Sequence, residues 1–271
     1  MTLEDPTTAT LLLGITALMS LMPAVLLPWR QEPGNWLTWC LHLVALAGCG
    51  AALSWQVALG WSDRLSLALW LSTAIMLLLY PAVAARWRGS SRLAPLLYGY
   101  LLLLAFGATL LPSDPGGYDF GVTMTGWLVA HIVFALIAYG LAGLASIAGL
   151  AVFLQELALK RRRPNALSQR LPALADGERL QMALLGWTEA ALAATILSGM
   201  AHEMVTSGQL LRLDHKTLLV LAAFLVIGLL LLLSWQRGLR GRQAARILLL
   251  AYLLLTLAYP GVKFVGDLLT G

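Results

Sequence analysis

Charged residues are scarce in this chain. Only 11% of its 271 residues are Asp, Glu, Lys or Arg, whereas 59% are hydrophobic, and the mean hydropathy is +0.80. Soluble domains carry roughly 25% charged residues, so a chain of this composition cannot hide its apolar surface from water. The composition therefore excludes a soluble globular protein and predicts a polytopic membrane protein.

Cysteine is rarer still, with Cys40 and Cys49 the two in the chain. At about 100° per residue they project from opposite sides of one helix, so they cannot clasp one metal, and we interpret them as small hydrophobic side chains. The CxxC and CxxCH patterns are absent, which excludes a c-type cytochrome. No Walker loop, dinucleotide glycine loop or internal repeat occurs, and we predict that the protein is not an enzyme.

Long apolar runs dominate what is present. Runs of about 20 residues, enough to cross roughly 30 Å of hydrocarbon, occur eight times. They are Ala9–Leu27, Trp36–Trp55, Leu65–Ala85, Leu93–Leu111, Gly126–Leu154, Leu180–Met200, Thr217–Trp235 and Ala244–Phe264. The prediction is an all-α polytopic membrane helix bundle with eight transmembrane helices, forming a single transmembrane domain over residues 1–271.

Basic residues follow the apolar runs asymmetrically. Of the 18 Lys and Arg residues, 14 fall in the connections after runs 1, 3, 5 and 7. Positive loops stay cytoplasmic, so both termini are predicted outside, and the first run is expected to be a retained anchor rather than a cleaved signal. The net charge of +5 is explained by this asymmetry and gives no reason to propose nucleic-acid binding. The basic stretch after run 5 is interpreted as an anchor touching anionic lipid headgroups.

The four histidines divide by this topology. His131, His202 and His215 lie near the outer ends of their runs, whereas His42 lies about 9 Å inside the cytoplasmic end of run 2. Small residues project within about 60° of His131 along the same helix. They are Ala135, Ala138, Ala142, Ser146 and Gly149. Such a strip is typical of close helix packing, although a flat macrocycle would use the same recess.

An imidazole in hydrocarbon must be paired or bound to something. Zinc prefers three or four protein ligands, whereas haem needs one or two axial histidines, so the histidines favour haem over zinc. Glu189 is a second polar group within an apolar run, and His42 approaches it from the same side of the membrane. Glu189 is interpreted either as a protonated, hydrogen-bonded carboxyl group or as a partner of His42.

Several motifs resemble one family. WLVAHIVFALIAYG at 127–140, followed by LASIAGLAVFLQELALK, is similar to the signature span of the cytochrome c assembly family, which includes CcsA, CcmC and HemX. Further resemblance lies in LSG at 197–199, LDHKTLL at 213–219, GLRGRQAAR at 238–246 and LAYPGVKFV at 257–265. The resemblance covers roughly residues 36–267 and is closest to the YpjD-like inner-membrane branch.

The resemblance implies a haem-handling protein of the bacterial inner membrane, with His131 as an axial ligand at the outer face. It also places His42 where larger members carry an intramembrane haem ligand. Two features depart from the family. The tryptophan-rich segment WGxxWxWDPKE is absent, and Ser234 and Trp235 stand near the place where related proteins carry a histidine.

Our hypothesis is therefore a non-enzymatic protein of cytochrome c biogenesis that binds haem b. His131 is the predicted first iron ligand, with His215 or His202 as the second, and His42 is a further candidate for cofactor binding. Haem, the lipid bilayer and a membrane or periplasmic protein are the predicted partners. Two alternatives are a permease-type transport subunit, using Glu189 and His42 as a polar path, and a structural subunit without haem.

Overall fold

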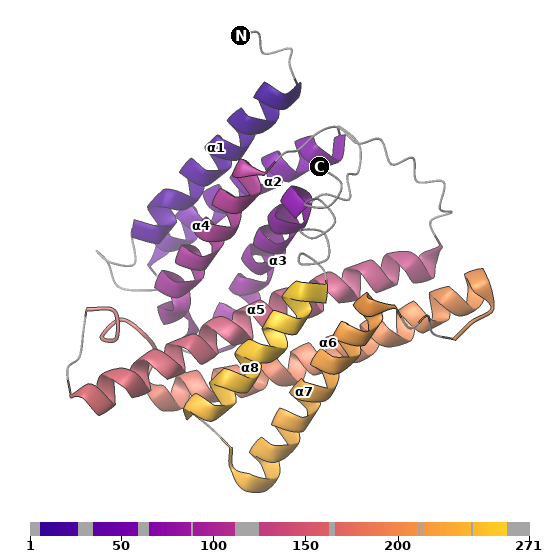
Figure 1. Cartoon of the computed structure of the whole chain (residues 1–271). Helices are drawn as coiled ribbons and strands as arrows, with labels where there is room; N and C mark the ends of the chain where they lie inside the picture. Colours follow the sequence, from indigo (N-terminus) through magenta and orange to yellow (C-terminus); the bar gives the residue numbers. More distant parts are fainter. Residues whose placement is uncertain are drawn as a thin grey trace. The chain divides into compact units, whose positions relative to one another are not determined.

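The computed structural model has helices and no strands in the residues that it describes, which are 6–26, 35–58, 65–87, 89–111, 125–162, 166–210, 212, 214–239 and 241–258. These residues form eight α-helices (Figure 1). They are α1 (Pro6–Leu26), α2 (Trp36–Ala58), α3 (Leu65–Arg86), α4 (Ala94–Leu110), α5 (Gly126–Arg161), α6 (Leu174–Ser207), α7 (His215–Arg237) and α8 (Gly241–Thr256). A short 3₁₀ turn, Ser90–Leu93, precedes α4. The all-α prediction is confirmed for the described part of the chain.

Seven helices, α1 to α7, are long and apolar enough to cross a membrane. The predicted eighth span is represented by α8, which has 16 residues and ends at Thr256. The remainder of that predicted span, from residue 259, lies outside the described residues. The protein is thus a multi-pass membrane protein with seven candidate spans, while the placement of its termini stays a prediction.

Helices α5 and α6 extend well beyond the apolar runs that predicted them. The run ending at Leu154 continues as helix to Arg161, and α6 begins at Leu174, before the run that starts at Leu180. With 36 residues, α5 is about 54 Å long, far more than the roughly 30 Å of hydrocarbon. The apolar runs therefore mark only the central part of each helix, and polar turns extend both helices past them.

Side-chain caps and glycine residues define the ends of α5, α6 and α7. The Thr125 side chain caps α5 by accepting a hydrogen bond from the backbone N–H of Leu128, and Asp214 caps α7 by accepting one from Thr217. Gly208 and Gly238 end α6 and α7 in the left-handed conformation, which glycine adopts without strain.

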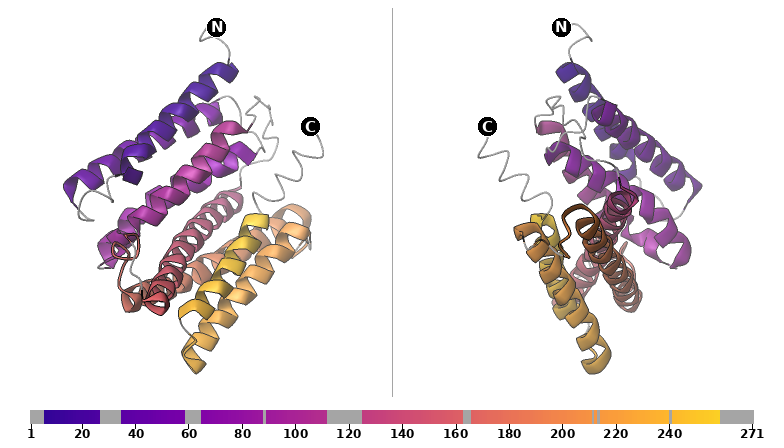
Figure 2. Two further views of the ribbon diagram at one scale, coloured as in Figure 1. Left: turned by 60° about the vertical axis from the view of Figure 1, so that its left-hand side comes forward. Right: turned by 90° about the vertical axis from the view of Figure 1, so that its right-hand side faces the viewer.

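The helices form two compact units. In unit 1, α1 packs against α2 and α4, and α3 packs against α2 and α4. In unit 2, α5 and α6 pack along their length, α8 packs against α5, and α7 packs against α8 and α6 (Figure 2). The prediction of a single transmembrane domain is not tested by this division and stays a prediction.

The strip of small residues below His131 lies inside unit 2. Ala138, Ala142, Ser146 and Gly149 are buried, whereas Ala135 is partly exposed. Gly149 lies against Gln181 of α6, and His131 lies against Gly199 of the same helix. Eighteen residues separate the two contact points on each helix, so α5 and α6 run antiparallel in constant register. Close helix packing is therefore the role of this strip.

Candidate functional site

His131 is held by a backbone carbonyl of the neighbouring helix. Its ring lies on the second turn of α5, half-buried, with Nδ1 at 2.9 Å from the carbonyl oxygen of Thr195 on α6. A carbonyl oxygen only accepts, so Nδ1–H must be the donor. In a neutral ring this leaves Nε2 with its lone pair, the form of imidazole that binds a metal.

A glycine makes room for this ring. A Cβ added at Gly199 would lie 3.0 Å from both Cε1 and Nδ1 of His131, closer than ordinary side-chain contacts. Gly199 is one turn beyond Thr195, whose carbonyl also accepts a hydrogen bond from the Ser198 hydroxyl at 3.0 Å. The imidazole therefore sits in a notch formed by Thr195 and Gly199. Gly199 belongs to the LSG motif at 197–199, whose contact with His131 could not be predicted from the sequence.

His202 lies at the same α5–α6 interface, closer to the end of α6. Its Nδ1 lies 3.0 Å from the hydroxyl of Thr125, which also caps the start of α5. A hydroxyl both donates and accepts, so this bond suits either tautomer of the ring. His202 is three residues beyond Gly199, about 4.5 Å along the α6 axis. The structure thus brings His131 and His202 to neighbouring turns of the α5–α6 seam.

His215 is placed differently. It is the first residue of α7, its side chain is exposed, and it forms no hydrogen bond within the described part of the chain. The adjacent Asp214 accepts the backbone N–H of Thr217, which lowers the pKa of its carboxyl group, and the nearby His215 lowers it slightly further. Asp214 is therefore an anion beside His215 at neutral pH.

His42 belongs to unit 1, where both of its ring nitrogens have partners. Nε2 lies 3.0 Å from the Leu77 carbonyl oxygen and therefore donates, and Nδ1 accepts from the Tyr98 hydroxyl at 2.9 Å. The side chain is 1% exposed, with the rings of Trp39 and Tyr80 5.8 and 5.7 Å from its own. A cofactor role for His42 stays a prediction, and in this arrangement the ring has no nitrogen free for a metal.

The Glu189 carboxyl group lies against Gly228 of α7. Its Oε1 would lie 2.8 Å from a Cβ added at Gly228, so α7 approaches this closely because it carries glycine there. The other carboxyl oxygen, Oε2, is buried without a hydrogen-bond partner among the described residues. Both ring nitrogens of His42 have other hydrogen-bond partners. The pairing of His42 with Glu189 stays a prediction.

The side chains of this site suit a metal ion that is already held by the nitrogens of a cofactor. The described residues contain no cluster of three or more His, Cys, Asp or Glu side chains that could hold a metal ion. Cys40 is exposed and Cys49 is buried, and both are free thiols. Zinc would need a fuller set, whereas a haem iron takes four nitrogens from its macrocycle and needs only axial imidazoles.

Comparisons with known proteins agree with one another. A family model described as cytochrome C assembly protein matches residues 33–270. An uncharacterised 28.8 kDa protein of Azospirillum brasilense is 46% identical over 264 residues, covering 95% of this chain and 97% of that protein.

Two named proteins are more distantly similar. The inner membrane protein YpjD of Escherichia coli is 27% identical over 188 residues, which is 69% of both chains. Protein HemX of Brevibacillus brevis is 27% identical over 169 residues, covering 62% of this chain and 61% of that protein. No solved structure matches the chain.

Proposed function

This chain belongs to the cytochrome c assembly protein family, and we propose that it binds haem b at its outer face through His131. The family resemblance predicted from the sequence is confirmed, as is a multi-pass protein of the bacterial inner membrane. Family membership indicates a role in haem-related cytochrome c biogenesis. We propose that this role is non-enzymatic and consists of binding haem and passing it to a membrane or periplasmic protein partner.

The observation that carries the proposal is the hydrogen bond between His131 Nδ1 and the Thr195 carbonyl. Histidines that ligate metals usually donate their second ring N–H to a carbonyl or carboxylate, which fixes the tautomer and raises ligand basicity. The notch at Gly199 holds the ring in that orientation. The residues present therefore fit a haem ligand, and haem bound there would supply a redox-active iron.

For the second ligand we propose His215, with His202 as the competing candidate. The His215 side chain is exposed and makes no hydrogen bond within the described residues, so ligation would break no existing contact. His202 would have to keep or exchange its bond to Thr125. Its position one turn from Gly199 nevertheless keeps its imidazole on the same seam.

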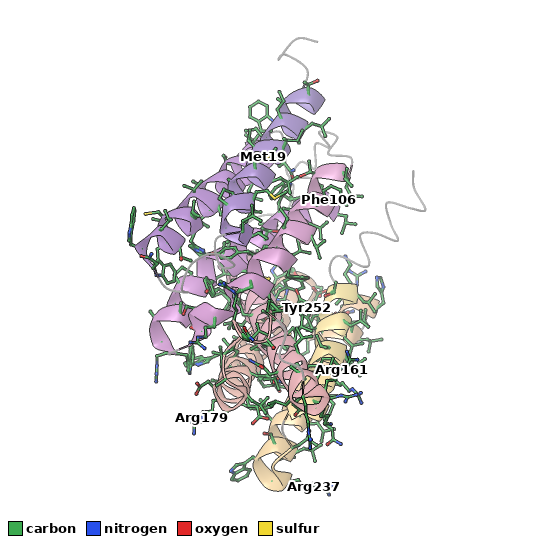
Figure 3. The ribbon with its side chains drawn as sticks, turned by 90° about the vertical axis from the view of Figure 1, so that its left-hand side faces the viewer. Met19, Phe106, Arg161, Arg179, Arg237 and Tyr252 are labelled. Carbon is green, nitrogen blue, oxygen red and sulfur yellow. The ribbon has the colours of Figure 1, made fainter. Side chains whose placement is uncertain are left out.

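The outer-face assignment is supported by the charges at the ends of unit 2. Basic side chains gather where α5 and α7 end and where α6 and α8 begin; Figure 3 labels Arg161, Arg179 and Arg237 among them. His131 is 30 residues from Arg161 on α5, about 45 Å along the axis. Positive ends face the cytoplasm, so the histidine end faces the opposite side.

An absorption spectrum of the purified protein, recorded before and after dithionite, tests this function. We expect a Soret band with sharp reduced α and β bands. His131→Ala should abolish the bands or leave a five-coordinate, high-spin remnant, whereas His42→Ala should leave the spectrum almost unchanged because both His42 nitrogens are already bonded. His215→Ala and His202→Ala, measured side by side, identify the second ligand.

Two outcomes would overturn the proposal. A colourless protein that takes up no added haem would show that the protein does not bind haem. A spectrum lost in His42→Ala and kept in His131→Ala would move the site to unit 1.

One observation favours a second candidate, a permease-type subunit. Glu189 has a buried oxygen without a partner among the described residues, within a helix that is long and apolar enough to span the membrane. Intramembrane carboxyl groups of this kind often mark the path of an ion or a solute. Transport lost in Glu189→Gln, in a protein that binds no haem, would favour this candidate.

A further inference from the structure

The segment LQELALK at 154–160 belongs to the family resemblance but lies at the end of α5 opposite the histidines. Its first polar residue, Gln155, holds the connection between α5 and α6. The amide nitrogen of Gln155 donates to the carbonyl oxygens of Ser168 at 2.8 Å and Pro172 at 3.1 Å, and the carbonyl oxygen of Leu171 lies 3.5 Å away. Ser168 and Leu171 are buried, so this part of the connection is folded onto α5.

The next residue, Glu156, holds the start of α8. Its Oε1 accepts a hydrogen bond from the backbone N–H of Arg242 at 3.1 Å, and it lies against Gly241, where a side chain would not fit. Oε1 of Glu178 on α6 approaches the same glycine, at 3.4 Å from the position that a Cβ would take. A carboxylate at a helix N-terminus accepts an unpaired N–H and faces the positive end of the helix dipole. Glu156 therefore fixes α8 to α5.

The Arg242 side chain adds a contact to the same part of α5. Its guanidinium carbon lies 5.2 Å from the centre of the Phe153 ring, which is a cation–π contact. Phe153, Gln155 and Glu156 thus hold two connections, the one between α5 and α6 and the one between α7 and α8. A loop that only follows the positive-inside rule needs basic residues but no fixed structure. The contacts give this end of unit 2 a fixed arrangement that topology alone does not require.

Basic side chains are exposed on this arrangement. They are Lys160, Arg161, Arg162, Arg179, Arg237 and Arg246, three of which are labelled in Figure 3. Asp176 is the one exposed acidic residue in the described parts of 155–179 and 234–246. The surface therefore carries an excess of positive charge and fits an anionic partner.

Trp235 indicates which anionic partner this surface meets. Its side chain is 85% exposed, two residues before Arg237 at the end of α7, and Leu229 and Leu232 on the preceding turns are also exposed. Along α7, exposed side chains thus change from leucine to tryptophan to arginine. Leucine suits acyl chains, tryptophan suits the membrane interface, and arginine suits charged headgroups. This order favours lipid over an acidic protein or a nucleic acid.

We propose that this basic end of unit 2 is a preformed binding site for anionic phospholipid headgroups, held in shape by Gln155 and Glu156. The lipid phosphate accepts hydrogen bonds from the exposed guanidinium and ammonium groups, and arginine can pair with two of its oxygens at once. Basic pockets beside membrane helices bind anionic headgroups in this way. The inference is independent of haem binding, since the site lies at the other end of α5 from His131.

Native mass spectrometry of the full chain in detergent, with added phosphatidylglycerol or phosphatidylcholine, tests the proposal. The two lipids have matched acyl chains, so that only the headgroup differs. We expect phosphatidylglycerol to bind several-fold more tightly, and an equimolar amount of inorganic phosphate not to displace it. Equal binding of the two lipids would overturn the proposal. Displacement by phosphate would assign the site to a free anion and would overturn it as well.

Charge variants locate the site. Arg161→Gln combined with Arg179→Gln should reduce phosphatidylglycerol binding several-fold. Arg212→Gln combined with Lys216→Gln is the matched control, because it removes two exposed charges at the opposite end of α6 and α7. Phosphatidylglycerol binding should be unchanged in this second pair. Equal losses in both pairs would show that the lipid is attracted by overall charge, which contradicts a site at this end.

Shape variants separate a built site from general attraction. Gln155→Met keeps the charge but removes the hydrogen bonds to the connection, and Glu156→Ala makes the surface more positive but releases α8. We expect both to weaken phosphatidylglycerol binding, whereas attraction by charge alone predicts no change for the first and tighter binding for the second. Gln169→Met, at an exposed glutamine of the same connection, is the matched control and should change nothing.

Undiminished binding in both shape variants would contradict the proposed role of Gln155 and Glu156. The comparison of the two lipids and the charge variants still decide whether the site exists if a shape variant fails to fold.

Discussion

The orientation of the His131 imidazole depends on backbone features of α6 rather than on another polar side chain. The Thr195 carbonyl fixes which ring nitrogen carries the proton, and Gly199 leaves the space that the ring occupies. The sequence identified the histidine because a polar ring in an apolar run is conspicuous. It could not identify the carbonyl, since every residue has one, and a glycine acquires this role only when two helices pack at that position.

We predict that Gly199→Ala weakens haem binding although it alters no ligand. The added methyl carbon would lie 3.0 Å from His131 Nδ1 and Cε1, so the ring must shift and its bond to Thr195 must lengthen. Changes to such supporting contacts typically cost 10–100-fold in metal affinity, and we expect a loss of roughly that size in haem titrations.

Gly186→Ala is the matched control for that substitution. Gly186 lies on the same helix with nothing within 4 Å of an added Cβ, so haem affinity should be unchanged. Equal affinity of Gly199→Ala and the unmodified protein would show that the notch does not position the ring.

At the scale of elements, α5 and α6 form a long antiparallel pair whose contact surface is made of small residues. Ala138, Ala142 and Gly149 are buried, while Trp127 and Val133 of the same helix are about half exposed. The sequence predicted this surface correctly because small residues at helical spacing allow helices to approach closely. The contact of Gly149 with Gln181 could not be predicted, since it depends on the register of the pair.

We predict that Ala138→Asp greatly reduces the amount of folded protein. Ala138 is 1% exposed, so a carboxyl group there would be buried between helices as well as within the membrane. Insertion scales assign roughly 2.5–3.5 kcal/mol to such a charge at a helix centre. Detergent-solubilised yield and size-exclusion profiles measure the effect.

A pair of leucine substitutions separates packing from charge. Ala138→Leu should also lower the yield, because overpacking a tight interface costs about 1–3 kcal/mol. Val133→Leu, at a side chain that is 47% exposed on the same helix, should not. Normal yields of both Ala138 variants would mean that this surface of α5 does not pack as the structure has it.

For the whole molecule, the distribution of basic residues predicts which end of each unit faces the cytoplasm. The sequence predicted the all-α class and eight spans, seven of which correspond to helices long and apolar enough to cross a membrane, because both predictions depend on composition and periodicity. The apolar runs cover only part of α5 and α6, which continue as helix into polar sequence. The division into two units was not foreseen, since it depends on which helices pack together and hydropathy carries no information on that.

We predict that the connection between α5 and α6 is cytoplasmic and that the connection between α6 and α7 lies outside. Gln169 and Gln209 are exposed residues in these connections, and each can be replaced by cysteine after Cys40 and Cys49 have been changed to alanine. Because 14 of the 18 basic residues fall on the predicted inner side, an impermeant maleimide should label Gln209→Cys in intact cells. It should label Gln169→Cys only after permeabilisation. The reverse pattern would place His131 and His202 on the cytoplasmic side, and haem would then have to be delivered from within the cell.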